Sequence, residues 1–343
     1  MTLIRRLRTA LVITTVVVAP ATGSVLAAPA TAPVLPPAGA AAWQADRRQL
    51  PDPVTATPSE VRAWFAAMPA ARQAALAAEH PGVVGNLDGA PIALRYAANR
   101  RSLQESGVDH PDGDYLIFDP RGRGRVAQVF GDLSTALRVA VIVPGMRNRL
   151  ANFWRGVGGQ AYRSPAVQAA DLQRAGSGPG GLAVIAWLGY DAPQGFDEAG
   201  RPHLSQSGAT ALTRFVDGLA AVRPDATIAL LGHSYGSTVI GHAAPRLSPR
   251  VTDLAVFGSP GMGVDSAAAL RTGARVWAGQ STGDFVAWVP PGRLFGMGHG
   301  AKPVDPGFGA RLFPTADVSD HDHYLSPGTD SFTALAGIAG GRR

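Results

Sequence analysis

Short apolar runs separated by helix-like segments are the feature that most constrains the fold of this chain. From about residue 114 these runs cover residues 115–118, 126–130, 139–143, 182–187, 227–231, 254–257 and 275–278. Most of the later runs are continuously apolar rather than alternating, as expected for strands buried on both faces under crossover helices. The pattern predicts an α/β fold around a sheet whose centre is mostly parallel.

The segments before residue 113 have a different character. The chain has 343 residues with 46% apolar types, which is enough for one large domain and an appendage. Residues 1–32 combine three arginines, an apolar run and small-residue sites, so we expect an export signal peptide. An uncleaved membrane anchor is the alternative, although the apolar run is short for a bilayer span. Residues 33–57 are rich in Ala and Pro and predict an extended linker, and residues 58–112 predict a helical N-terminal appendage.

Charge and cysteine content exclude several classes of protein. The formal net charge is +6, three of these charges lie in the N-terminal signal segment, and the remaining arginines are scattered among 25 acidic residues. This argues against a nucleic-acid surface. The one arginine cluster, residues 121–125, separates two strand-like runs and predicts a hairpin turn. Cysteine is absent, so disulfides and thiolate metal sites are impossible, and an oxidising destination is compatible with the sequence.

The stretch "LLGHSYGS" places a serine between two glycines where a strand-like run becomes a helix-like one. The pattern G-x-S-x-G in this context is typical of a nucleophile elbow, a turn so sharp that glycine is favoured at positions 232 and 236. The turn would lift the hydroxyl of Ser234 out of the sheet at the positive end of the following helix. Ser234 is therefore the candidate nucleophile, and His233 is expected to point away from it.

A serine nucleophile needs a base and a carboxylate that orients the base, in the chain order serine, acid, histidine. Asp284 follows the run at 275–278 and is the leading acid, with Asp265 as the alternative. His321 and His323 follow a strand-like run at 312–318 and are better placed than His299; His321 is preferred. His323 stays an alternative, because residues two positions apart on an extended segment point to the same face.

An acyl-transfer intermediate also needs two backbone donors for its oxyanion. The N–H of Tyr235, directly after the serine, is expected to be one. The N–H of Met146, after the run at 139–143, is expected to be the other. Cofactors are not expected, and the spacing typical of a metal site is missing from the sequence.

The motifs together resemble a family of secreted actinobacterial α/β-hydrolase domains of unknown function. The resemblance covers roughly residues 58–335 and includes "VAVIVPGM", "VIAWLGYDAP", "LLGHSYGS" and "FGSPG". It implies an α/β-hydrolase catalytic domain at residues 113–343, with Ser234 as nucleophile and Asp284 as acid. In the family a histidine stands a few residues before a tyrosine, which matches His321 with Tyr324, although here a second histidine occupies position 323.

These observations predict a secreted or envelope-bound serine hydrolase that cleaves carboxylic esters through an acyl-enzyme. The expected partner is a small-molecule or lipid ester, with possible peripheral contact to a membrane or envelope. Aromatic residues after several of the runs would suit an apolar ester, and the segment 289–308 could form a lid. Two alternatives stay open: an acyltransferase that uses the same triad on a lipid or sugar, and a non-catalytic envelope-binding module.

Overall fold

The computed structural model describes residues 36–176, 178, 180–294 and 297–342. The expected signal segment at residues 1–32 lies outside these residues. Among the helices that are described, none has the length and apolar character that a membrane span requires.

The predicted runs form one eight-stranded mixed sheet, in the order β1-β2-β4-β3-β5-β6-β7-β10. β1 and β2 are antiparallel to each other, β2 is antiparallel to β4, and the other neighbours are parallel. The prediction of an α/β fold with a mostly parallel centre is confirmed. The strands are β1 (Asp114–Asp119), β2 (Arg125–Phe130), β3 (Arg138–Val143), β4 (Leu182–Leu188), β5 (Thr227–His233), β6 (Val251–Phe257), β7 (Arg275–Gly279) and β10 (Arg311–Leu312).

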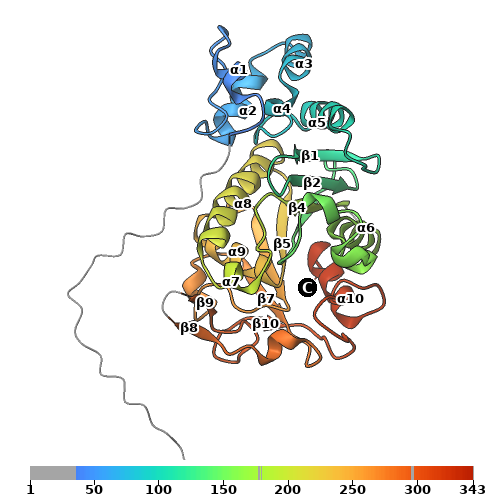
Figure 1. The fold of residues 1–343 in the computed structure, drawn as a ribbon, viewed down its shortest axis with the longest axis vertical. Coiled ribbons are helices and arrows are strands. Elements are labelled where there is room, and N and C mark those ends of the chain that lie inside the picture. Colours follow the sequence, from blue (N-terminus) through green and yellow to red (C-terminus); the bar gives the residue numbers. More distant parts are fainter. Residues whose placement is uncertain (1–35, 177, 179, 295–296, 343) are drawn as a thin grey trace, which may run out of the picture. The chain divides into compact units, whose positions relative to one another are not determined.

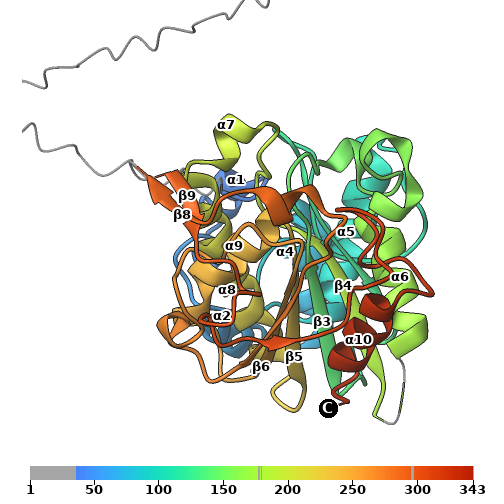
Figure 2. The same cartoon turned by 90° about the horizontal axis from the view of Figure 1, so that it is seen from below.

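Helices cover both faces of this sheet because its central strands are apolar on both sides; β4 is buried at every position. α8 and α9 pack together on one face, while α6 and α10 pack together on the other (Figures 1 and 2). The helices are α1 (Ala40–Gln44), α2 (Pro58–Ala66), α3 (Ala70–Glu79), α4 (Pro81–Val84), α5 (Ile92–Ser106), α6 (Pro165–Gly176), α7 (Phe196–Ala199), α8 (His203–Val222), α9 (Tyr235–Ala243) and α10 (Asp330–Ala339).

The N-terminal segment differs from the extended linker expected at residues 33–57. Its described part contains α1, whose Trp43 is buried in a small core with Val61 and Phe65 of α2. The indole of Trp43 also donates a hydrogen bond to the carbonyl of Pro51. The prediction of a linker over these positions is wrong because Trp43 brings enough apolar surface to dock the Ala- and Pro-rich segment.

The helices at 58–112 are confirmed as helices, and the start of α2 follows from a capping box between Thr57 and Glu60. They do not form a detached body, because the described chain from residue 36 onward belongs to one compact unit. Buried Arg95 and Asn99 of α5 donate hydrogen bonds to the β1 carbonyls of Leu116 and Tyr115. The N-terminal helices are therefore joined to the edge of the sheet by polar contacts.

Two expectations near the C-terminus need correction or refinement. The strand expected over 312–318 is only the two residues of β10, since Pro314 lacks the N–H that a longer ladder needs. The rest of that run is loop. Within 289–308, β8 (Gly292–Leu294) and β9 (Met297–Gly300) form a separate antiparallel hairpin.

The hairpin turn expected at residues 121–125 is confirmed between β1 and β2.

Candidate active site

Ser234 lies at the carboxyl end of β5, directly before the first residue of α9. Its backbone has φ 53° and ψ −125°, which is a strained conformation for a residue with a side chain. The strain persists because β5 is paired on both sides and α9 packs onto the sheet. The local sequence thus folds into the sharp strand-to-helix turn that the glycine spacing predicts.

Close backbone contacts explain the glycines around this turn. A Cβ atom at position 236 would lie 2.1 Å from the carbonyl oxygen of Val143 at the end of β3. A Cβ atom at Gly145, in the loop after β3, would lie 2.7 Å from the Cβ atom of Ser234. Both distances are too short for a side chain. The loop after β3 therefore approaches Ser234 at backbone distance.

His321 and Asp284 are brought together from two different loops. The Nδ1 atom of His321 lies 2.8 Å from Oδ1 of Asp284, although 37 positions separate them in the chain. Asp284 follows β7 and is completely buried, whereas His321 lies in the long loop between β10 and α10. Because Asp284 occupies Nδ1, the other ring nitrogen of His321 is left for a reacting group.

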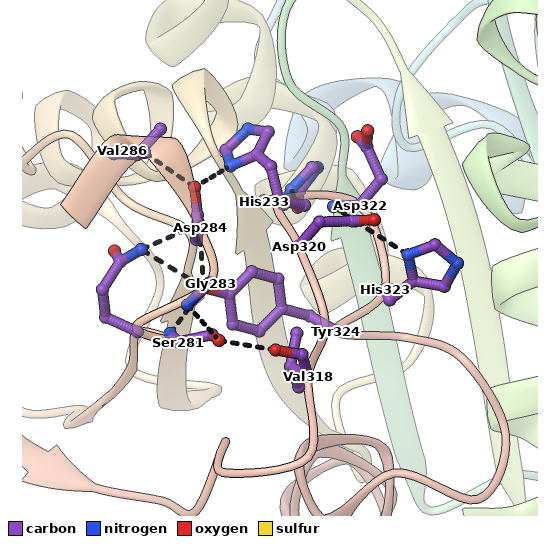
Figure 3. A network of polar contacts seen from close by, with 12 residues as sticks. His233, Ser281, Gly283, Asp284, Val286, Val318, Asp320, Asp322, His323 and Tyr324 are labelled. Carbon is purple, nitrogen blue, oxygen red and sulfur yellow. Dashed lines mark hydrogen bonds and ion pairs between the residues drawn. The ribbon is translucent and has the colours of Figure 1, made fainter. Parts of the chain in front are cut away.

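Asp284 accepts further hydrogen bonds, which stabilise its negative charge. Oδ1 also accepts from the N–H of Val286, and Oδ2 accepts from the Gln280 amide and the Tyr324 hydroxyl, each at 2.8 Å (Figure 3). Burial by itself raises the pKa of this carboxyl, but the hydrogen bonds, led by that of His321, outweigh burial and lower the pKa. Asp284 is therefore an ionised carboxylate at neutral pH.

Tyr324 and Gln280 both donate hydrogen bonds to Asp284, contacts that the sequence analysis did not anticipate. Besides donating to Asp284, the Tyr324 hydroxyl accepts from the N–H of Ser281 at 2.8 Å. This contact joins the loop after β7 to the loop between β10 and α10, residues 313–329, which we call the histidine loop (Figure 3). The spacing of the histidine and Tyr324 was the available signal, and the structure supplies a physical reason for it.

His323, the competing histidine, has different partners. Its Nδ1 lies 2.7 Å from Oδ1 of Asp320 (Figure 3). Its ring stacks on Tyr162, with the centroids 4.2 Å apart. Next to it, Asp322 forms an ion pair with Arg163 at 2.8 Å. These contacts hold the histidine loop against the 3₁₀ turn η3 (Ala161–Arg163).

His233 was expected to point away from the serine, and its ring packs against that of His321, with the centroids 4.7 Å apart. His233 and Ser234 line the same cavity, and Nε2 of His233 lies 2.7 Å from the carbonyl oxygen of His321. The turn places His233 beneath the histidine loop, where neutral His233 can donate to that carbonyl. Burial, together with the nearby His321, lowers the pKa of His233 to about 4, so its ring is neutral at pH 7.

A cavity of about 440 Å³ is lined by Ser234, by His321 and by Met146, one of the two expected oxyanion residues. The side chain of the other, Tyr235, is buried elsewhere against Tyr190. Only the N–H of Tyr235 can therefore take part, and as the first residue of α9 it has no carbonyl partner within the helix. The two expected donors thus come from the loop after β3 and from the first residue of α9.

The alternative residues lie outside this cavity. Asp265 accepts a hydrogen bond from the N–H of Ala301, and His299, on β9, contacts the hydroxyl of Thr238 at 3.3 Å. Most of the aromatic residues expected at the mouth belong to the core or surface instead. Phe285 lines the cavity, and Phe196, which was not anticipated, faces it from α7.

One group of side chains in the described part of the chain has the geometry of a metal site, namely Asp46, Glu79 and His80. The guanidinium of Arg48 already contacts both carboxylates there. This cation supplies the positive charge that a metal ion would bring, and the group lies in the N-terminal helices rather than at the cavity. We therefore assign no metal to it.

Comparison with known sequences supports the assignment of the fold. A family model described as alpha/beta hydrolase matches residues 119–293, about half of the chain. An uncharacterized protein of Mycobacterium tuberculosis is 29% identical over 377 residues, which cover 85% of this chain and 57% of that protein. An uncharacterized protein of Mycobacterium bovis is 33% identical over 174 residues, covering 48% of this chain and 64% of its own. The chain spans little more than half the length of the first of these relatives.

Solved structures with a similar chain path include several hydrolases. A serine hydrolase without a lid from Xanthomonas campestris has 15% identity and a TM-score of 0.41, covering 68% of this chain and 95% of its own. An esterase from Pyrobaculum calidifontis has 13% identity and a TM-score of 0.40, covering 76% of this chain and 95% of its own.

Proposed function

Since this chain belongs to the α/β-hydrolase family, we propose that it is a serine hydrolase of carboxylic esters that acts through an acyl-enzyme. One observation carries the proposal: Ser234, at a strained strand-to-helix turn, shares a cavity with a histidine that is hydrogen-bonded to a buried carboxylate. This is the arrangement that nucleophilic acyl transfer needs.

The proposed reaction proceeds in two halves. The Oγ atom of Ser234 attacks the ester carbonyl while the free ring nitrogen of His321 takes the hydroxyl proton. The N–H groups of Met146 and Tyr235 stabilise the negative oxygen of the tetrahedral intermediate. When the intermediate collapses, the C–O bond to the alcohol breaks and His321 protonates the leaving alkoxide. The acyl group then remains on Ser234.

Water completes the cycle. His321 removes a proton from a water molecule that attacks the acyl-enzyme, and the second intermediate collapses to release the carboxylic acid. The proton returns through His321 to Oγ of Ser234, so the enzyme is regenerated. Asp284 stabilises the protonated His321 in both halves, because its buried charge lies 2.8 Å from Nδ1.

Probe labelling and turnover test this proposal together. A fluorophosphonate should label the purified protein and not the Ser234→Ala variant, and 4-nitrophenyl acetate should be hydrolysed only by the former. Ser207→Ala is a matched control, because Ser207 lies on α8 outside the cavity and its hydroxyl donates to the Leu204 carbonyl of the same helix. Equal labelling of wild type and Ser234→Ala would rule out Ser234 as the nucleophile.

We also propose that the protein is exported and acts in the envelope or outside the cell. The order of arginines, apolar run and small residues over residues 1–32 supports this. N-terminal sequencing of the protein from culture medium should find a start near Ala27 or Ala32. Recovery of the Met1 form in the membrane fraction would favour an anchor instead.

A further inference from the structure

The cavity beside Ser234 has a polar wall, although the aromatic content of the sequence favoured an apolar ester. Six polar side chains contribute to this wall: Arg147, Asn148, Arg163, Gln168, Gln194 and Asp322. They come from the loop after β3, η3, α6, the loop after β4 and the histidine loop. The cavity therefore presents charged and hydrogen-bonding side chains beside apolar ones such as Phe196 and Phe285.

The acidic groups near the cavity already have partners. Asp322, the one carboxylate among the lining residues, pairs with Arg163 at 2.8 Å. Asp284, behind the lining, is occupied by His321, Val286, Gln280 and Tyr324. Neither carboxylate is therefore available to neutralise a second guanidinium.

Arg147 is that second guanidinium. It is solvent-exposed, it lines the cavity, and within the described residues its side chain makes no ion pair or hydrogen bond. It directly follows Met146, the residue of the proposed oxyanion donor, and both residues line the cavity. The N-terminus of α9, the positive end of its dipole, directly follows Ser234 at this cavity.

The backbone holds Arg147 there at an energetic cost. Its φ of 68° is in the left-handed region, which few non-glycine residues adopt. Two hydrogen bonds fix it: the Arg147 N–H donates to Pro193 at 2.7 Å, and its carbonyl accepts from the Asn152 amide at 2.9 Å. Glycine would adopt this conformation without strain, whereas arginine adopts it at an energetic cost.

We propose that the substrate is an ester carrying a carboxylate or phosphate group, and that Arg147 binds this negative charge. The proposal rests on the proposed function and names its substrate class. A guanidinium offers a planar set of donors that matches a carboxylate or phosphate in two parallel hydrogen bonds. A neutral ester of the same length gains no such contact.

Two matched pairs of esters test the proposal and locate the charge. Mono-4-nitrophenyl adipate against 4-nitrophenyl hexanoate places the charge on the acyl side. 4-Acetoxybenzoate against its methyl ester places the charge on the alcohol side. We expect kcat/KM of the wild type to favour the anionic member of at least one pair, and the preference to shrink in high salt.

Substitutions at position 147 test whether Arg147 causes the preference for anionic esters. Arg147→Gln should lower the anionic-to-neutral ratio of kcat/KM by about tenfold, as expected for loss of a charged hydrogen bond. Arg147→Lys has the same backbone strain but keeps the charge, so it should retain most of the ratio. Arg149→Gln is the control, since Arg149 is exposed two positions away and does not line the cavity; its ratio should equal that of the wild type.

The outcomes separate this proposal from the proposed function. Ester turnover without anionic preference, or an unchanged ratio in Arg147→Gln, would overturn the role of Arg147 and leave the hydrolase intact. Absence of turnover on all four esters would instead contradict the hydrolase. Calorimetric binding of monomethyl adipate and methyl hexanoate to Ser234→Ala protein then decides the substrate class. Preferential binding of the anion that is lost with Arg147→Gln supports it, and equal binding overturns it.

Discussion

His321 and His323 lie two positions apart, yet their partners suit different roles. His321 contacts the buried Asp284, whose charge would stabilise a protonated ring. His323 contacts Asp320, which is half-exposed, and stacks on Tyr162. In the proposed mechanism, His321 is therefore the base and His323 a positioning residue of the loop.

Substitution of each histidine by glutamine distinguishes these roles. His321→Gln removes the base and should lower kcat by about 10³–10⁴. His323→Gln should lower kcat by about tenfold or less, because it only loosens the loop. The measurement is kcat on 4-nitrophenyl acetate, with circular dichroism to check folding. A large loss in His323→Gln beside a small one in His321→Gln would reverse the assignment.

His233 couples stability to pH. Its pKa is lowered to about 4 in the folded state, against about 6.5 in an unfolded chain. Above pH 6.5 the ring is neutral in both states. As pH falls from about 6.5 to about 4, the unfolded chain binds a proton that the folded chain does not, so the free energy of unfolding decreases.

His233→Asn tests this linkage, because asparagine keeps a donor for the carbonyl of His321 but does not titrate over this range. The fall in Tm between pH 7 and pH 4.5 should be larger for the wild type than for the variant. Carboxylates titrate in both proteins, so the difference between the two falls isolates His233. Equal falls would mean that His233 titrates normally in the folded protein.

At the scale of elements, the site depends on how closely α9 and the loop after β3 approach each other. Gly236 lies on α9 against the carbonyl of Val143 at the end of β3. A side chain there would push the helix away from the strand. Because Ser234 is the residue that enters α9, the same displacement would move the proposed nucleophile relative to Met146.

Gly236→Ala should therefore lower the free energy of unfolding by about 1–3 kcal/mol, as overpacking does, and should reduce ester turnover. Gly337→Ala in α10 is the matched control, because a Cβ atom there meets nothing within 4 Å. It should raise stability by up to about 1 kcal/mol through helix propensity. Urea denaturation measures both values, and similar effects of the two substitutions would contradict the close approach.

At the scale of the whole molecule, buried Arg95 connects the N-terminal helices to the sheet. It forms an ion pair with Asp88 at 3.0 Å and donates to the carbonyls of Gly85 and Leu116. These partners belong to the helical segment and to β1. The helices and the sheet are therefore expected to unfold together.

Arg95→Met should lower the free energy of unfolding by about 3–5 kcal/mol, since it leaves the carboxylate of Asp88 buried without its closest cation. Arg101→Met, which removes an exposed pair with Glu105, should cost about 1 kcal/mol or less. Thermal unfolding should stay a single transition in all three proteins. A separate early transition in wild type would show that the N-terminal helices unfold independently.

The sequence alone determined the features that depend on near neighbours in the chain. Continuous apolar runs predicted the strands because burial of both faces leaves that pattern in the residues themselves. The glycines at 232 and 236 predicted the turn at Ser234 because a sharp turn restricts side chains within a few positions. The order of the residues along the chain then predicted Asp284 as the acid and a histidine of the C-terminal loop as the base.

Only the tertiary structure decided which of these side chains meet. His321 rather than His323 contacts Asp284 because Pro314 ends the short β10 and the loop after it is held by Tyr162 and Arg163. Docking of residues 36–57, the contact of His233 and the exposed charge of Arg147 were likewise decided by the path of distant segments. Such contacts join residues tens or hundreds of positions apart, and irregular loops have no period in the sequence from which their paths could be read.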